Sequence, residues 1–504
     1  MSQDATSTCI EGIEEKHGSL TPIAEKRCMY KVHEQLRKVN KEAYEPVLLA
    51  IGPYNYNQGK PVGGAFMKER KERYLQQMLE RTTGSKERYM KALEKLEVKA
   101  RTCYVECTSQ ISPREFAEMM LLDGCFIIEL FHKCKTRDCP DDPIFKMEWV
   151  LPRIARDLLL FENQLPFFVL LELFRMTESR NSREIVIDVD VESSTSKDLS
   201  ICKLSHLALK FFHRYLSFEW DVHESNYNSK EKIEHLVCLM NEALIPSLPK
   251  MVWKRLQVGF RFKNVDQFEH LLRLIHATIC ISILDAEIAH ARERHDQAKK
   301  VILKMPKIFQ HPVIPLLAKR KDMSNQEPLL PEELKEAGIE LKKSKNNNMF
   351  SIKFNNALME VSPLLIDDRT ETCLRNLIAY EQYCDRDESL NYVTNYVFFM
   401  DSLINSTKDV ELLRRRGIIQ NYLGDDKATS TMVNKLCDNI NLSTYNIYSR
   451  TSRNLNKHCT GRCNKQMAKL KRDYFNSPWA WISFLAATLL LVLTFVQTVF
   501  SIIP

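Results

Sequence analysis

The chain has 504 residues and a formal net charge of +7; 44% of its residues are hydrophobic and 27% are charged, an ordinary globular composition with room for several cores. Its 13 glycines are fewer than half of the usual roughly 7%. Because nucleotide-binding α/β folds use glycine in phosphate loops and all-β folds use it in turns, this scarcity favours a mostly helical protein.

Charge and cysteine usage argue against two classes of protein. The basic runs are scattered and none alternates with aromatic residues, so we expect no nucleic-acid partner. The 15 cysteines are an odd number without the dense, regular spacing of a secreted disulfide framework, which favours a reducing compartment. Residues 1–22 are expected to form a flexible N-terminus, since the chain begins polar and has no apolar signal core.

The first regular elements follow this N-terminus. Apolar residues recur at helical spacing over 23–44, and the apolar run near 47–51 predicts a short buried strand that leads into a turn. Two further helices are predicted, over 66–79 and 86–107.

A strongly apolar helix is predicted to begin after Ser112, which forms a capping-box pattern with Glu115. Asp123 falls on the apolar face of this helix. A carboxylate there needs partners, because an unpaired buried charge is costly.

The stretch LLLFENQLPFFVLLELF, residues 158–174, is apolar but carries Glu162, Asn163 and Gln164 at its middle. A charge at the centre of a membrane helix costs about 2.5–3.5 kcal/mol, so this stretch belongs in the core of a large domain. We expect the three polar residues to form a buried hydrogen-bonded network with Asp123 and an arginine such as Arg153. The alternative is an enzyme that uses Glu162 or Asp123 as an acid or base tuned by burial.

The second half of the chain contains exposed loops and more helices. Polar composition predicts loops near 175–200 and 319–348, with a long helix over 268–305 between them. Two alternating runs separated by Asn355-Asn356 predict a hairpin near 349–361. Further helices are predicted over 371–383, 392–404, 409–416 and 426–436. The helical domain is therefore expected to cover 23–475.

The C-terminal residues 479–503 contain no charged residue. A helix of about 25 residues is long enough to cross a hydrocarbon core of about 30 Å, so this segment predicts one transmembrane helix. The residues expected at the membrane interface are Trp479, Trp481, Lys469, Lys471 and Arg472. Since only Pro504 follows, the expected arrangement is a tail-anchored, single-pass membrane protein whose bulk faces the cytosol.

Motifs that would identify an enzyme are missing from the sequence. There is no Walker loop, GxGxxG, HExxH or GxSxG pattern. Three groups leave a metal site open as an alternative, although none has the paired spacing of a structural zinc site: Asp188, Asp190 and Glu192; His132, Cys134 and Cys139; and His458, Cys459 and Cys463. We expect no catalytic residues, cofactor, metal or small-molecule substrate.

Several segments in order along the chain resemble the plant family called domain of unknown function 247. They include LLDGCFIIELF at 121–131, LLFENQLPFFVLLELF at 159–174 and DVELLRRRGIIQNYLG at 409–424. Two departures from the usual family pattern are Asn55-Tyr56-Asn57 in place of a histidine pair, and His33 in place of proline.

The resemblance implies a plant protein with a mainly helical domain, a C-terminal membrane helix and no established enzymatic activity. Some grass members are associated with self-incompatibility loci. Together these observations predict a non-enzymatic, membrane-anchored module that binds other proteins, with a role in recognition between pollen and stigma as a narrower alternative.

Overall fold

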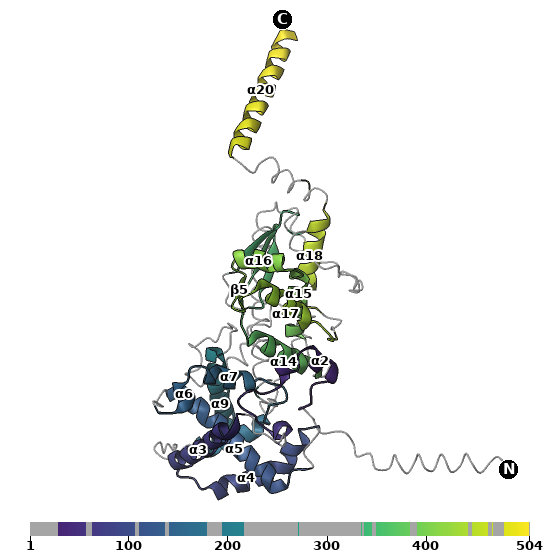
Figure 1. Ribbon diagram of the computed structural model, residues 1–504. Helices are drawn as coiled ribbons and strands as arrows, with labels where there is room; N and C mark the ends of the chain where they lie inside the picture. Colours follow the sequence, from purple (N-terminus) through teal and green to yellow (C-terminus); the bar gives the residue numbers. More distant parts are fainter. Residues whose placement is uncertain are drawn as a thin grey trace, which may run out of the picture.

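The computed structural model describes residues 29–56, 63–105, 110–136, 141–178, 194–215, 337–344, 349–383, 391–441, 446–461 and 478–502, together with the single positions 271, 334 and 466. As predicted, these residues form a mainly helical structure with small sheet elements. Figure 1 shows two groups of elements, one built from the first half of the chain and one from the second.

The first group is a set of helices arranged around α5 (Pro113–Thr136). Its other members are α3 (Gly64–Thr82), α4 (Lys86–Thr102), α6 (Pro143–Lys146), α7 (Val150–Asp157), α8 (Phe167–Glu178) and α9 (Ser194–Tyr215). α5 packs against α3, α4, α8 and α9, and it is buried on nearly every side between Phe116 and Phe131. This position in the centre explains why its sequence is apolar all round rather than along one stripe.

Two contacts show how closely the helices approach α5. The rings of Phe126 on α5 and Tyr74 on α3 are stacked with their centroids 4.9 Å apart. A Cβ atom on Gly124 would lie 2.4 Å from Cδ1 of Leu173, so a larger residue on α5 would have to displace this side chain of α8.

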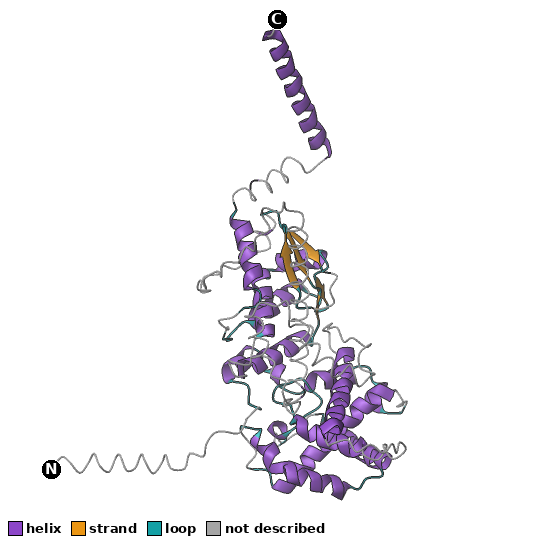
Figure 2. Cartoon of the chain, turned by 180° about the vertical axis from the view of Figure 1, so that it is seen from behind, coloured by secondary structure: helices purple, strands orange, loops and turns teal. Residues whose placement is uncertain are grey.

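The second group combines short strands with helices (Figure 2). The three-stranded sheet has the order β1-β3-β2, from β1 (Glu340–Lys343), β2 (Ile352–Asn355) and β3 (Leu358–Val361). β4 (Leu364–Ile366) and β5 (Ile419–Asn421) form a parallel pair. The helices are α14 (Thr370–Tyr383), α15 (Tyr392–Leu403), α16 (Thr407–Arg415), α17 (Asp426–Leu436) and α18 (Ser449–Thr460).

The hairpin predicted near 349–361 is confirmed by the antiparallel pairing of β2 with β3. Its turn lies at Asn356 and Ala357, which have φ values of 49° and 62°. Two successive positive φ angles are the signature of a two-residue type I′ turn. The predicted loop at 319–348 is partly wrong, because β1 lies within it and pairs in parallel with β3.

A segment near the N-terminus connects the two groups. It contains α2 (Glu34–Val39), η1 (Glu42–Tyr44) and η2 (Pro53–Asn55). The side chain of Asn376 on α14 donates to the carbonyl of Ala43 at 2.8 Å and accepts from the N–H of Phe161 at 2.8 Å. Asn376 therefore ties this segment, and the connection between α7 and α8, to the second group.

Two predictions for this segment are wrong. Of the helix predicted over 23–44, residues 23–28 lie outside the described residues, and within 29–44 the only α-helix is α2. Residues 47–51 form no strand, although Leu49 and Ile51 are buried as expected. The physical reason is that their backbone hydrogen bonds go to side chains of distant helices instead of a neighbouring strand.

Two other predicted segments fall partly or wholly outside the described residues. The loop expected at 175–200 is interrupted, since α8 extends to Glu178 and α9 begins at Ser194. Residues 179–193, and the helix predicted over 268–305 apart from position 271, are not described.

At the C-terminus, Pro478–Ile502 form the helix α20, which stands apart from both groups in Figure 1. Across the part of the chain that the structure describes, no helix is long and apolar enough to cross a membrane.

The predicted transmembrane helix, and the single-pass, tail-anchored location derived from it, are therefore corrected. Of the residues expected at a membrane interface, Lys469, Lys471 and Arg472 lie outside the described residues, as do the side chains of Trp479 and Trp481.

Candidate functional site

The apolar stretch 158–174 is divided by a tight connection between α7 and α8. Gln164 stabilises this connection, because its side-chain amide donates to the carbonyls of Leu158 at 2.7 Å and Leu160 at 2.8 Å. The backbone N–H of Asn163 also donates to the carbonyl of Leu160 at 3.0 Å. The polar residues therefore interrupt the apolar run in order to fold it back on itself inside the core.

Asn163 joins this connection to the N-terminal segment. Its Oδ1 accepts from the N–H of Ile51 at 2.6 Å and from the side chain of Asn55 at 3.1 Å. Its Nδ2 donates to the carbonyls of Leu49 and Asp157, both at 2.8 Å. The side chain thus makes two hydrogen bonds as acceptor and two as donor, the full complement of an amide.

Glu162 holds the start of the N-terminal segment. Its Oε1 accepts from the N–H of Val32 at 2.6 Å, and its Oε2 accepts from the Arg37 guanidinium at 2.7 Å. The residue is only 9% exposed. Arg37 also reaches Glu45 at 3.4 Å, so one cation serves a buried and a more exposed carboxylate.

Asp157 is the most completely buried acid of this region, at 0% exposure. It accepts the N–H groups of Val47, Leu48 and Leu49, at 2.7 Å for Leu48 and 2.8 Å for Leu49. The Arg156 guanidinium lies 2.7 Å from its Oδ1. Burial raises the pKa of Asp157, while the three N–H donors and Arg156 oppose that rise.

Arg156 makes its remaining contacts with the backbone. Its guanidinium donates to the carbonyl of Glu45 at 3.0 Å and to the carbonyl of Glu42 at 2.8 Å. The Arg156–Asp157 pair therefore satisfies both donors and acceptors of the N-terminal segment.

Asp123 approaches the same segment from α5. Its Oδ2 accepts from the N–H of Gly52 at 2.9 Å, and its Oδ1 lies 2.5 Å from Nζ of Lys71 on α3. Nζ of Lys71 also donates to the carbonyl of Ala50 at 2.6 Å. The partners that the sequence analysis required for this buried carboxylate are thus a lysine and a backbone N–H.

Gly52 is required by the backbone geometry at this point. Its φ of +72° lies in a backbone region that residues with a side chain rarely adopt. A Cβ atom at this position would also lie 2.8 Å from the carbonyl oxygen of Gln164. The hydroxyl of Tyr104 donates to that same carbonyl at 2.9 Å.

The structure brings together Asp123, Glu162, Asn163 and Gln164 around residues 47–55, but Arg153 is exposed on α7 and takes no part. Arg156, three residues further along α7, is the arginine that contacts the network. Sequence reasoning missed Asp157, Arg37, Lys71 and Asn376 as members. The one available signal was the adjacent pair Arg156-Asp157 at the edge of an apolar run.

The chemistry of this cluster is that of a structural network. Both oxygens of Glu162 and of Asp123 accept hydrogen bonds from a cation and a backbone N–H. Among the residues that the structure describes, no three His, Cys, Asp or Glu side chains are placed to hold a metal ion. Asp188, Asp190, Glu192, Cys139 and Cys463 lie outside those residues.

Comparison with known proteins identifies the family. A family model described as a plant protein of unknown function, DUF247, matches residues 29–493. The chain belongs to this family. The DUF247 match confirms the resemblance seen in the sequence, and the family description assigns no activity.

Two Arabidopsis thaliana proteins are similar to this DUF247 member over most of its length. The first, UPF0481 protein At3g47200, is 25% identical over 484 residues, which cover 94% of this chain and 86% of the relative. The second, Putative UPF0481 protein At3g02645, is 21% identical over 519 residues, which cover 93% of this chain and 89% of the relative. No solved structure matches the chain.

Proposed function

We propose that this protein is a non-enzymatic module that binds other proteins, with its buried polar network serving as the frame of the scaffold. The observation that supports this most directly is that both carboxylate oxygens of Glu162, the best candidate for acid–base catalysis, already have hydrogen-bond partners. Its two oxygens are occupied by Val32 and Arg37, and they connect α2 to the α7–α8 connection. A general base needs access to a substrate proton, and a carboxylate used in this way lacks that access.

Asp123 supports the same proposal. Its contacts with Gly52 and Lys71 hold the N-terminal segment against α3 and α5, and the residue is buried. The enzyme alternative requires an accessible carboxylate at one of these two positions, and neither offers one.

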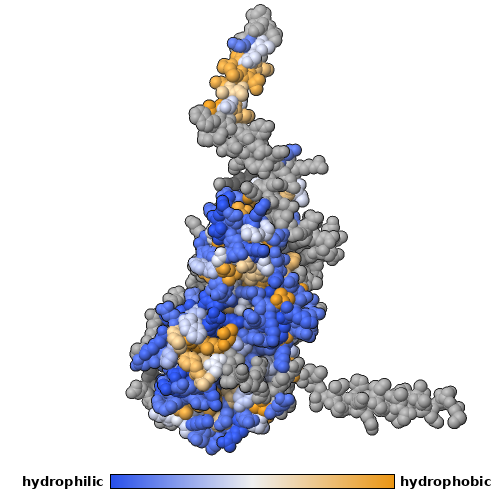
Figure 3. Space-filling model, in the orientation of Figure 1, coloured by the Kyte–Doolittle hydropathy of each residue, from blue (hydrophilic) through white to orange (hydrophobic). Residues whose placement is uncertain are grey.

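The surface offers side chains of the kind that anchor protein partners. Trp149 is 56% exposed and Tyr422 is 68% exposed. Large aromatic residues are enriched at the centres of protein–protein interfaces. In Figure 3 the surface of both groups is largely hydrophilic, and an apolar patch lies over the region where Figure 1 places α6 and α7.

The narrower role in recognition between pollen and stigma rests on the family resemblance alone. The loops expected to determine such specificity, 175–200 and 319–348, lie largely outside the described residues.

Proximity labelling from the full-length chain in plant cells tests the proposal. We expect a reproducible set of labelled proteins that is lost when the scaffold is disrupted by Asp157→Ala. A labelled set no larger than that of a tag-only control would reject the proposal. An enzyme would instead show a substrate conversion by the purified full-length protein that disappears in Glu162→Gln while the labelled set stays the same.

A further inference from the structure

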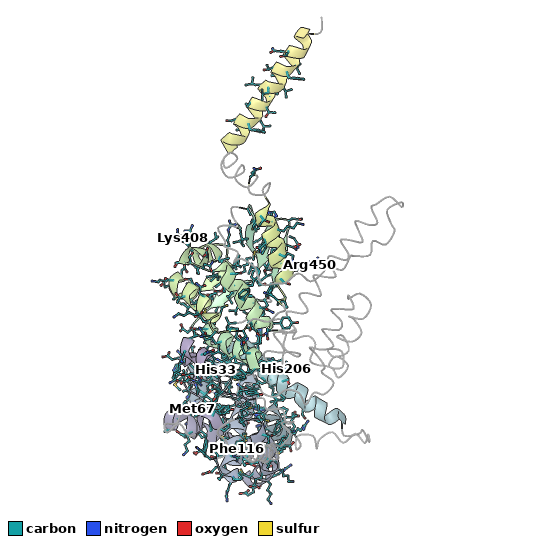
Figure 4. All side chains as sticks on the ribbon, turned by 90° about the vertical axis from the view of Figure 1, so that its right-hand side faces the viewer. His33, Met67, Phe116, His206, Lys408 and Arg450 are labelled. Atoms are coloured by element: carbon teal, nitrogen blue, oxygen red, sulfur yellow. The ribbon has the colours of Figure 1, made fainter. Side chains whose placement is uncertain are left out.

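One face of α18 carries a row of basic residues, which we call the α18 stripe: Arg450, Arg453 and Lys457. All three are exposed, and their spacing of i, i+3 and i+7 places them along one face over about 10 Å. Figure 4 labels Arg450 on α18. The opposite face is buried and comprises Ser452, Leu455 and Cys459.

α18 is held firmly enough to present these charges in a fixed arrangement. The helix packs against β2, and the rings of His458 and Phe354 meet edge to face at 5.8 Å. Leu455 is completely buried beneath the stripe. Charged side chains on a packed helix lose less conformational freedom on binding than those on an unstructured segment.

The stripe has no acidic neighbours along the chain. Residues 448–472 contain eight Lys and Arg residues and no Asp or Glu. Within the described residues, none of the three basic side chains forms an ion pair. Some basic residues elsewhere in the second group are paired, as Arg414 is with Asp426 and Arg415 is with Glu411.

We propose that the α18 stripe binds an acidic segment of a partner protein, whose carboxylates match its spacing of about one heptad. This inference rests on the proposed function, because it names the chemistry of one partner. Complementary charge across an interface directs encounter and orients the partner. A helix with Glu or Asp at i, i+3 and i+7 presents three carboxylates over the same length as the stripe.

The exposed face of α18 is less suited to nucleic acid. Its remaining exposed residues, Asn454 and Thr460, include no aromatic ring on which a base could stack. Three charges in a straight row also give fewer phosphate contacts than the six to ten or so typical of duplex binding.

The chain contains a matched control on α4. Arg88, Lys91 and Lys95 are exposed and have the same spacing of i, i+3 and i+7. They differ from the stripe in being flanked by the exposed acids Glu87 and Glu94, which lie within helical reach of Lys91. Reversing either triplet to Glu changes the net charge by the same amount.

The test measures binding of a labelled poly-L-glutamate peptide to the full-length protein by fluorescence anisotropy at low and moderate salt. We expect the triple variant R450E/R453E/K457E to weaken binding at least about tenfold, since three attractive pairs become repulsive. The variant R88E/K91E/K95E should change the affinity less than about twofold, because the neighbouring carboxylates of Glu87 and Glu94 lower the positive potential at that face. Circular dichroism and thermal unfolding of both variants check that the fold is retained.

Three results would overturn this assignment. The first two are an equal loss of peptide affinity in the two variants and an unchanged peptide affinity in the α18 variant. The third is stripe-dependent binding to duplex DNA or to phosphatidylserine vesicles that is tighter than binding to the peptide. Proximity labelling separates this failure from that of the proposed function. If the labelled set is reproducible but unaffected by the α18 variant, the interaction module stands and only the stripe is rejected.

Discussion

The N–H of Leu49 donates a hydrogen bond of 2.8 Å to Oδ2 of Asp157, a residue 108 positions later in the chain. The same carboxylate accepts the N–H groups of Val47 and Leu48. One buried side chain thereby replaces the partner strand that an extended, apolar segment otherwise needs. This relationship makes Asp157 the most sensitive position of the network.

We expect Asp157→Asn to lower the free energy of unfolding by about 3 kcal/mol, since it leaves Arg156 unpaired and turns an amide NH2 group toward N–H donors. Asp141 is a suitable control, because its side chain is 95% exposed. Asp141→Asn should change the free energy of unfolding by no more than about 0.5 kcal/mol. Urea denaturation of the full-length protein measures both, and equal midpoints for the two variants would contradict the role given to Asp157.

Gly52→Ala separates conformational strain from steric contact. Gly424 has a positive φ of 83°, like Gly52, but has open space where a Cβ would stand. Gly424→Ala should therefore cost only the strain of the left-handed conformation, about 1 kcal/mol. Gly52→Ala should cost at least about 2 kcal/mol, because its Cβ also meets the carbonyl of Gln164. Denaturation midpoints measure the difference, and equal costs would show that the contact does not matter.

Asn376→Ala should loosen the connection between the two groups of elements. It leaves the Phe161 N–H and the Ala43 carbonyl without their partner, which is expected to cost about 3 kcal/mol. Hydrogen exchange provides a local readout, because the amide of Phe161 should lose its protection. Asn454→Ala on the exposed face of α18 is the control and should leave that amide unchanged.

The raised pKa of Asp401 predicts that the free energy of unfolding depends on pH. Burial raises the pKa of this carboxyl to about 6, and the neighbouring Asp438 adds to the rise while a hydrogen bond with Cys437 opposes it. Because the folded pKa lies above the unfolded value of about 3.9, the folded state holds the proton more tightly. Stability from this group is therefore present at low pH and is lost as the pH rises from about 4 to about 6.

Asp401→Asn isolates this contribution, because an amide does not titrate. The stability of the wild-type protein relative to the variant should fall between pH 4.5 and pH 6.5, as measured by chemical denaturation at both pH values. A constant difference across that range would contradict the raised pKa of Asp401.

Local features of the structure could be predicted from the sequence, because their interactions are local. The capping box at the start of α5 is one such feature: the Glu115 N–H donates to the Ser112 hydroxyl at 3.3 Å, and the Ser112 N–H donates to the Glu115 carboxylate at 3.1 Å. The β2–β3 hairpin is another, although its turn lies one residue later than expected. Burial of Glu162, Asn163 and Gln164 followed from their apolar surroundings.

The partners of those buried residues could not be predicted in the same way. Arg153 and Arg156 differ by less than one helical turn, and only packing decides which of them faces the core. The run at 47–51 has the composition of a strand, yet its hydrogen bonds go to Asp157 and Asn163, more than 100 positions away. A pattern of residue types carries no information on which distant side chain replaces a strand.

The bond between Asn376 and Ala43 spans 333 positions, which has a consequence during synthesis. Ribosomes add about 5–20 residues per second, so the segment around Ala43 waits for tens of seconds before its partner on α14 emerges. Leu49 gains its partners Asp157 and Asn163 much earlier, after 108 and 114 further residues. The two ends of this short segment therefore acquire their final hydrogen bonds at very different stages of synthesis.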